Sequence, residues 1–136
     1  MSHADPYINE VLVAHEFIAQ VLGSPDATAA QSEALLARFD AAFTMIGVSG
    51  TRIDFAGLTQ FFNTQRGSKA GLKIQIDQIN VVSRWPEGAV VEYREHQTLP
   101  GQAATLRRST VVFTLGESRC PLWRHLHETS VPMSVD

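Results

Sequence analysis

The side chains best suited to chemistry gather in one short stretch near the end of the chain, Trp123–Thr129. The stretch has the composition of a β-strand, in which successive side chains point to opposite faces of the sheet. One face then carries Leu122, Arg124, Leu126 and Glu128, and the other carries Trp123, His125, His127 and Thr129. The two leucines indicate that the first face looks toward the core. We therefore expect Arg124 and Glu128 to point into the mouth of a cavity and the second face to lie outside.

Glu128 is the first candidate for proton transfer. A carboxylate in an apolar cavity has its pKa raised by desolvation, and such a group can act as a general acid or base. The alternative is an ion pair between Glu128 and Arg94 or Arg108 on a neighbouring strand, because buried charges are normally paired. The ion pair is the simpler interpretation. His15, on the apolar face of the first predicted helix, is interpreted as a core histidine rather than a catalytic one.

Arginines on the neighbouring strands could hold a small molecule. A guanidinium group matches a planar carboxylate with two parallel hydrogen bonds, which makes Arg94 the first choice for a pocket residue. Arg107 has the parity of the apolar Val111 and Phe113, so we expect it to face the core as well. The predicted ligand-binding residues are Arg94, His96, Arg107, Arg124 and Glu128. Their charges favour an acidic or carbonyl-bearing ligand.

His125 and His127 place two imidazole rings on the same face of a strand, and His96 could be a third ligand to a metal ion. A metal site needs three or more ligands in a fixed geometry, and these rings have no cysteine partner. We therefore predict no metal and no cofactor. The two histidines and Trp123 are instead expected to form the outer sheet face on which a second copy of the chain packs as a homodimer.

The composition excludes several classes of protein. The chain has 136 residues, 44% hydrophobic and 18% charged, which is typical of one folded domain over residues 1–136. The net charge of −3 argues against a nucleic-acid surface. The single cysteine, Cys120, excludes an internal disulfide and favours a reducing compartment. No segment has the pattern of a secretory signal or a membrane span, so we expect a soluble cytoplasmic protein without membrane contact.

Helix signals occupy the first half of the chain. Asp5-Pro6 predicts the start of a helix that ends at Gly23, and Ser24-Pro25-Asp26 repeats the start signal for a second helix. Asp54 is predicted to cap a third helix. A short strand is expected before that third helix, over residues 43–46.

Alternating apolar positions in the second half predict four longer strands, over 72–81, 90–99, 104–115 and 122–131. A change of parity near Asp77-Gln78 indicates a β-bulge, since one extra residue exchanges the two faces. Tight turns such as Pro100-Gly101 require antiparallel neighbours. We therefore predict an α+β fold, a cone-like curved antiparallel sheet with three helices packed on its concave face and a cavity at the open end.

The order of these elements resembles the nuclear transport factor 2-like superfamily, which includes SnoaL-like polyketide cyclases, scytalone dehydratase, ketosteroid isomerase and the association domain of calmodulin-dependent kinase II. His125-Leu126-His127 followed by Pro132 is most similar to the last strand of that association domain. Further segments resemble a branch of bacterial relatives: Tyr93–Gln97, Leu99–Gly101, Arg107–Thr110 and Leu126–Thr129. The resemblance implies the cone-shaped fold. It also puts Asp40 near the position where some relatives keep a catalytic acid, although a cap or turn role is the simpler one for this residue.

Three functions remain open on these grounds. The first is a small-molecule-binding domain, dimeric, with one pocket per subunit at the open end of the sheet. The alternative is a cofactor-free isomerase, cyclase or dehydratase, with Glu128 or Asp40 as proton shuttle and an arginine or tyrosine as oxyanion donor. The third is a pure assembly domain. An enclosed Glu128 within hydrogen-bond distance of an arginine would count against the enzyme, and an unpaired one would favour it.

Overall fold

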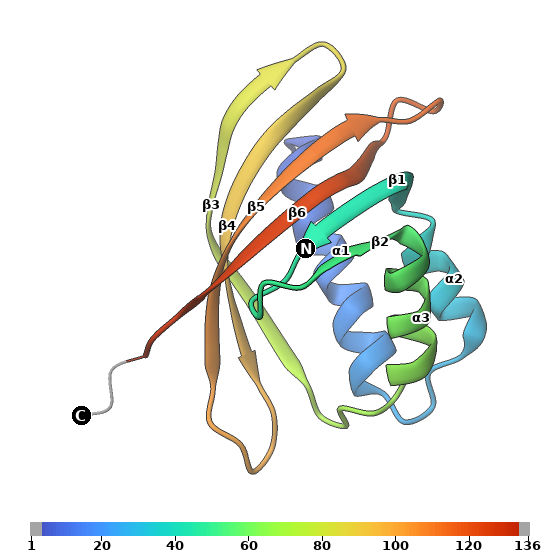
Figure 1. Cartoon of the computed structure of the whole chain (residues 1–136), viewed down its shortest axis with the longest axis vertical. Coiled ribbons are helices and arrows are strands. Elements are labelled where there is room, and N and C mark those ends of the chain that lie inside the picture. Colours follow the sequence, from blue (N-terminus) through green and yellow to red (C-terminus); the bar gives the residue numbers. More distant parts are fainter. Residues whose placement is uncertain (1–3, 134–136) are drawn as a thin grey trace.

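The computed structural model describes residues 4–133 and shows a curved sheet with helices on one side of it (Figure 1). Three helices lie in this part of the chain: α1 (Pro6–Gly23), α2 (Ala29–Leu36) and α3 (Phe55–Gln65). Six strands accompany them: β1 (Phe39–Ile46), β2 (Arg52–Asp54), β3 (Lys73–Trp85), β4 (Gly88–Thr98), β5 (Thr105–Leu115) and β6 (Pro121–Val131). The predicted α+β architecture is confirmed, with the helices against the concave face of an open sheet.

Helices α1 and α3 begin where their capping residues predict. The Asp5 carboxylate accepts hydrogen bonds from the backbone N–H groups of Tyr7 at 2.9 Å and Ile8 at 3.1 Å. The Asp54 carboxylate accepts one from the N–H of Gly57 at 3.0 Å. Each cap satisfies N–H groups that have no partner inside the first turn of a helix, so these short helices have defined starting points.

Helix α2 begins later than the Ser24-Pro25-Asp26 signal predicts. Thr28 and Gln31 form a capping box, in which each side chain accepts a hydrogen bond from the other residue's backbone N–H, at 3.2 Å and 2.8 Å. This reciprocal pair satisfies two free donors at once, which the earlier start would not. The preceding residues therefore form the turn between α1 and α2.

The sheet is mixed, with the strand order β2-β1-β6-β5-β4-β3. The four long strands β3 to β6 are antiparallel neighbours, as their tight turns predict. Strand β1 begins at Phe39, earlier than expected, and runs parallel to β6 with Met45 beside Leu126. A parallel pairing is possible because β1 and β6 are far apart in the sequence. Strand β2 was not predicted, since three residues are too few to show an alternating pattern.

A β-bulge interrupts β3 at the predicted place. The register between β3 and β4 shifts between Asp77 and Asn80, and Gln78 has a φ of 51°. A residue other than glycine rarely adopts this left-handed backbone conformation. The bulge turns the strand so that its apolar side chains on both sides of the break face the helices.

A second bulge, in β6, was not predicted and changes the faces of the last strand. Val112 of β5 pairs with His125, and the next residue, Phe113, pairs with Trp123. Arg124 therefore has no partner on β5. Because this extra residue exchanges the two faces, every side chain before it lies on the face opposite to the one that simple alternation predicts.

Trp123 consequently lies in the core, and the prediction that it forms the outer face is wrong. Its side chain is 1% exposed and packs on Phe39 and Phe113, with ring centroids 5.7 Å and 5.0 Å away. The indole Nε1–H donates to the carboxylate of Glu10 at 3.0 Å, so the buried polar atom is satisfied. Trp123 therefore joins the sheet to α1, which carries Glu10.

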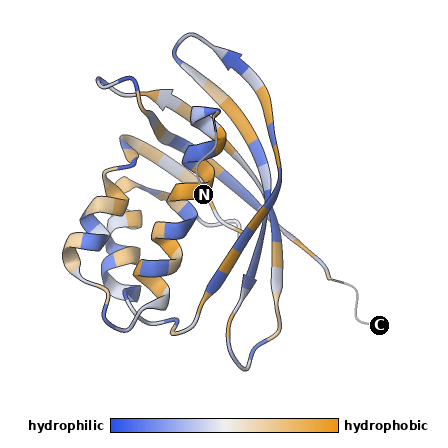
Figure 2. Cartoon of the chain, turned by 180° about the vertical axis from the view of Figure 1, so that it is seen from behind, coloured by the Kyte–Doolittle hydropathy of each residue, from blue (hydrophilic) through white to orange (hydrophobic). Residues whose placement is uncertain are grey.

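Hydrophobic and hydrophilic residues alternate along the strands, as the hydropathy colouring of Figure 2 shows. The apolar positions of the sheet face the helices, and the two layers enclose the core. No helix within residues 4–133 is both long enough and apolar enough to pass through a membrane. The core fills the narrow part between the layers, while one end stays hollow.

Candidate functional site

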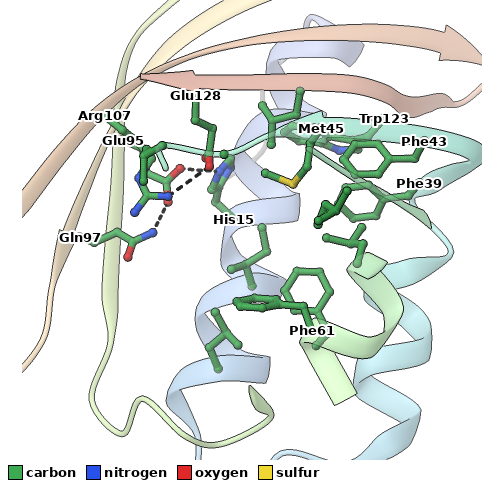
Figure 3. Close-up of a pocket in the computed structure, with 18 of the residues that line it drawn as sticks. His15, Phe39, Phe43, Met45, Phe61, Glu95, Gln97, Arg107, Trp123 and Glu128 are labelled. Atoms are coloured by element: carbon green, nitrogen blue, oxygen red, sulfur yellow. Dashed lines mark hydrogen bonds and ion pairs between the residues drawn. The ribbon is translucent and has the colours of Figure 1, made fainter. Parts of the chain in front are cut away.

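A cavity of about 310 Å³ lies between the concave face of the sheet and helices α1 and α3 (Figure 3). The sequence led us to expect a hollow at the open end of the sheet. Two exposed apolar residues, Val48 and Phe61, stand among the lining residues and mark its rim. A cavity of this size can enclose a small organic molecule.

Most of the cavity wall is apolar and aromatic. The apolar lining comes from α1, β1, the turn after it, β2, α3 and β6: Ile18, Leu22, Phe39, Phe43, Met45, Val48, Ile53, Leu58, Phe61, Phe62, Trp123 and Leu126. Strand alternation turns Phe43 and Met45 of β1 inward, and helical spacing turns Leu58 and Phe62 of α3 toward them. These walls can hold the body of a ring-bearing or branched molecule by apolar contact.

The polar part of the wall comes mainly from three neighbouring strands. Glu95 and Gln97 lie on β4, Arg107 on β5 and Glu128 on β6, and Glu95 is the direct cross-strand partner of Arg107. Arg107 Nη1 donates to Glu128 Oε1 at 3.3 Å, and Gln97 Nε2 donates to Glu95 Oε2 at 2.6 Å. These side chains converge at one end of the cavity, beside His15 of α1 (Figure 3).

His15 forms a buried ion pair with Glu95. Its Nδ1–H donates to the backbone carbonyl of Val11 at 2.7 Å, and Nε2 lies 3.2 Å from Glu95 Oε1. Both ring nitrogens thus face oxygen atoms, an arrangement that the doubly protonated imidazolium satisfies by donating from each nitrogen. Burial by itself would lower the pKa of His15, but the Glu95 charge outweighs it and the pKa is raised. Burial would likewise raise the pKa of Glu95, but His15 and Gln97 bring it below its ordinary value.

Glu128 differs from Glu95 although the two carboxylates share one cavity. Burial raises the pKa of Glu128, and the neighbouring charge of Arg107 only partly opposes the rise. The Glu128 side chain is 9% exposed. The neighbours of these two acids therefore separate their pKa values, a pattern that permits one to stay ionised while the other gains or loses a proton.

Of the five predicted ligand-binding residues, the structure brings Arg107 and Glu128 together in this cavity. Arg94 and His96 lie on the opposite face of β4, where they contact Asp77 of β3. The Arg94 Nε and Nη2 atoms donate to Asp77 at 2.8 Å and 2.7 Å, and His96 Nε2 lies 3.3 Å from the same carboxylate. The expectation that both residues face the cavity is thus corrected, because β4 turns the alternate positions inward.

Two more predicted residues point elsewhere. Arg124 is the unpaired residue of the β6 bulge, and it donates to the backbone carbonyl of Ala42 at 2.6 Å instead of entering the cavity. The Asp40 carboxylate accepts from the N–H of Ala42 at 2.8 Å and from the hydroxyl of Thr114 at 3.4 Å. Asp40 is not among the lining residues, and its contacts fit a turn role.

The histidine pair of β6 lies on the outer face. His125 Nδ1 and the hydroxyl of Thr44 are 2.7 Å apart, and His127 is exposed. His96 is occupied by Asp77 on β3. Within residues 4–133, no group of three or more His, Cys, Asp or Glu side chains is arranged to hold a metal ion.

Sequence reasoning missed Glu95 and Gln97, and it gave His15 no role in a site. A signal for Glu95 exists, because Glu95 has the parity of Val91 and Tyr93, the more apolar of the two rows of β4. Arg94, in the other row, is the stronger candidate by residue type alone, because a guanidinium suits a carboxylate ligand. His15 is a core residue as expected, but its partner on β4 lies 80 positions away and has no mark in the sequence.

No protein-family model and no curated protein matches the chain. Among solved structures, an NTF-2 like protein of unknown function from Pseudomonas aeruginosa is 33% identical, with a TM-score of 0.88 over 94% of this chain and all (100%) of that one. The association domain of CaMKII from C. elegans is 15% identical, with a TM-score of 0.68 over 90% of this chain and 94% of that one. A ketosteroid isomerase-like protein from Erwinia carotovora atroseptica is 8% identical, with a TM-score of 0.65 over 91% and 92%. The last two likenesses concern the fold alone.

Proposed function

The chain belongs to the nuclear transport factor 2-like family, and we propose on that basis that it is a small-molecule-binding domain whose ligand occupies the cavity at the open end of the sheet. The observation that carries the proposal is the division of the cavity wall. Aromatic and aliphatic side chains form most of it, and Glu95, Gln97, Arg107 and Glu128 form one polar end. Binding sites for small molecules usually combine an apolar wall with a few convergent polar groups.

The division of the wall suggests how a ligand would lie. Its apolar body would contact the aromatic side chains, and an acidic or carbonyl group would reach Arg107 at the polar end. A guanidinium group with an ionised or polar acceptor forms the stronger kind of hydrogen bond in such a water-poor site. Arg107 therefore takes the anchoring role that the sequence suggests for Arg94.

A fragment screen tests this proposal. We expect fragments with an apolar ring and one acidic or carbonyl group to raise the melting temperature of the wild-type protein. Arg107→Met should weaken their binding about tenfold, because one charge-assisted hydrogen bond is lost. Arg94→Met is the matched control, since Arg94 lies on the other face of the sheet and bonds to Asp77. Equal losses in both variants, or no binding fragment at all, would count against the proposal.

A cofactor-free isomerase, cyclase or dehydratase is the second candidate, supported by the raised pKa of the enclosed Glu128. Such a carboxyl could move a proton at a carbon next to a carbonyl, with Arg107 beside the developing oxyanion. The ion pair with Arg107 counts against it, because a paired carboxylate is a weaker base. The test is hydrogen–deuterium exchange, followed by NMR, at the carbon next to the carbonyl of any ketone that binds. Exchange that Glu128→Gln abolishes would favour the enzyme.

We also propose that the chain forms a homodimer through the outer sheet face that carries His125 and His127. The likeness to an association domain supports self-association, and the helices cover only the other face of the sheet. Trp123 takes no part, since it lies in the core. The cavity lies on the concave side, so a contact on the outer face leaves its mouth open.

A further inference from the structure

The charges that line the cavity are not balanced. His15 faces Glu95 at 3.2 Å, and Arg107 faces Glu128 at 3.3 Å. Lys69 lines the same cavity and forms no ion pair with any carboxylate of residues 4–133. The lining thus holds one cation more than it holds carboxylates, and this surplus attracts an anion.

Arg107 is the cation that an incoming anion can reach. Its side chain is 21% exposed and lines the cavity, whereas His15 is almost fully buried behind Glu95. The 3.3 Å contact with Glu128 is longer than the usual 2.7–2.9 Å or so of a charge-assisted hydrogen bond. No other hydrogen bond joins this guanidinium to the described part of the chain, so several of its N–H donors are available to a ligand.

An anion bound to Arg107 would meet the carboxylate of Glu128. Two carboxylates beside one guanidinium repel each other, and this repulsion favours the uptake of a proton by one of them. The ionisable groups that face Glu128 are His15 from α1, Tyr93 and Glu95 from β4, and Arg107 from β5. Burial and the two carboxylates raise the pKa of the Tyr93 phenol, so Tyr93 stays neutral.

Glu95 cannot be the group that takes this proton, because His15 and Gln97 hold it in the ionised form. Within residues 4–133, the Glu128 carboxylate has no hydrogen bond besides the long contact with Arg107, and its burial disfavours its charge. The O–H group of protonated Glu128 can donate a hydrogen bond to the ligand oxygen beside it. Glu128 and the ligand carboxylate together then carry a single negative charge, which lies next to the guanidinium of Arg107.

We propose that the cavity selects monocarboxylates with an aromatic or branched apolar body, and that Glu128 takes up one proton from solvent when the ligand carboxylate binds Arg107. The inference rests on the proposed function and names its ligand class. No covalent bond changes in the ligand: one proton leaves the buffer and one O–H bond forms on Glu128. Lys69, which also lines the cavity, adds to the attraction of the anion.

Proton uptake makes the affinity for the ligand depend on pH in one direction. Binding that consumes a proton weakens as the pH rises, by up to about tenfold for each pH unit in the range where free Glu128 is ionised. Aromatic carboxylates are themselves ionised above about pH 5.5, so their own titration does not produce this slope. A neutral ligand in the same cavity would show no such dependence.

The test compares acids with amides of the same shape. Phenylacetate and 3-phenylpropanoate are titrated calorimetrically into the full chain beside phenylacetamide and 3-phenylpropanamide, between about pH 5.5 and 8. Each titration is repeated at one pH in buffers of different ionisation enthalpy, which counts the protons taken up. We expect the acids to bind about tenfold more tightly than the amides at the low end of this range, and proton uptake to approach one at the high end, where free Glu128 is ionised.

Three variants sharpen the test. Glu128→Gln imitates the protonated acid, so it should bind the acids with no proton uptake and no pH slope. Arg107→Lys keeps the charge without the planar fork and should bind the acids more weakly while proton uptake persists. Arg94→Met, on the outer face, should match the wild type. Thermal melting of each variant shows that it is folded.

The outcomes separate this inference from the proposed function. If neutral fragments bind in the cavity and the acids do not, or if Glu128→Gln abolishes binding of the acids, the carboxylate inference is overturned and the binding function stands. Acids that bind without proton uptake would also overturn the inference and leave the binding function in place. If neither acids nor neutral fragments bind, both proposals fail.

Discussion

At the scale of single residues, the neighbours of each acid decide what the acid can do. Glu95 and Glu128 line the same cavity, and burial disfavours the charge of both. Glu95 faces an imidazolium and an amide donor, and its pKa falls. Glu128 has one long contact with Arg107, and its pKa rises. One carboxylate is therefore a fixed charge, and the other is the group that responds to a ligand or to pH.

The His15–Glu95 pair gives the stability of the protein a pH dependence. The pKa of His15 is raised by folding, so its contribution is complete below the ordinary value of 6.5 and is lost as the pH rises through the folded value. The pKa of Glu95 is lowered by folding, so its contribution is present above the ordinary value of 4.5 and is lost as the pH falls through the folded value. The pair stabilises most strongly in the window between these two ordinary values.

We predict that His15→Gln lowers the free energy of unfolding by about 3 kcal/mol in that window, because it leaves a buried carboxylate without its counter-charge. The variant should also lack the fall in stability that the wild type shows above the ordinary pKa of His15. Urea unfolding over a series of pH values measures both effects. The exposed His127→Gln is the control, and an unchanged slope in His15→Gln would contradict the assigned ion pair.

At the scale of elements, two bulges decide which side chains of β3 and β6 face the helices. The bulge of β3 can be predicted, because apolar residues on both sides of Asp77-Gln78 show the change of parity. The bulge of β6 cannot, because Leu122 and Trp123 are both large and apolar, and either could be the buried one. The choice depends on Phe39, Phe113 and α1, which form the pocket that the indole fills.

Deletion of Arg124 tests this assignment of the bulge. It leaves Trp123 directly before His125, so plain alternation along β6 keeps Trp123 opposite Phe113 and facing the core, and we expect stability to fall by no more than about 1 kcal/mol, the contribution of the hydrogen bond to Ala42. Arg124→Ala keeps the register and loses one exposed hydrogen bond to Ala42, at a cost of about 1 kcal/mol. Urea unfolding followed by tryptophan fluorescence compares the two. A loss of several kcal/mol in the deletion but not in Arg124→Ala would show that Arg124 is not the extra residue of the strand.

At the scale of the whole molecule, the two faces of the curved sheet differ in the side chains they carry. The concave face holds the core and the cavity, while the outer face carries polar and charged side chains, among them Arg94, His96 and His127. Burial, together with the nearby charges of His127, Arg124 and Arg52, lowers the pKa of His125. Positive charge thus gathers beside the face on which we propose that a second copy packs.

This gathering of charge provides a test of the proposed dimer. In a two-fold dimer the same patch is present on both sides of the contact, so one substitution adds a positive charge to each of the two facing surfaces. We predict that His127→Arg shifts the protein toward the monomer, which sedimentation velocity measures. Gln102→Arg, in the exposed turn between β4 and β5, is the control for the added charge. A dimer that His127→Arg leaves unchanged would exclude this face as the contact.

The sequence by itself determined the local and periodic features: the caps at Asp5 and Asp54, the long antiparallel strands and the bulge at Asp77-Gln78. These depend on hydrogen bonds and alternation between residues close in the chain. The tertiary structure alone decided that Arg107 and Glu128 meet His15 and Glu95, whereas Arg94 turns away. The physical reason is that each strand has two faces, and which face turns toward the helices depends on packing against residues far away in the sequence.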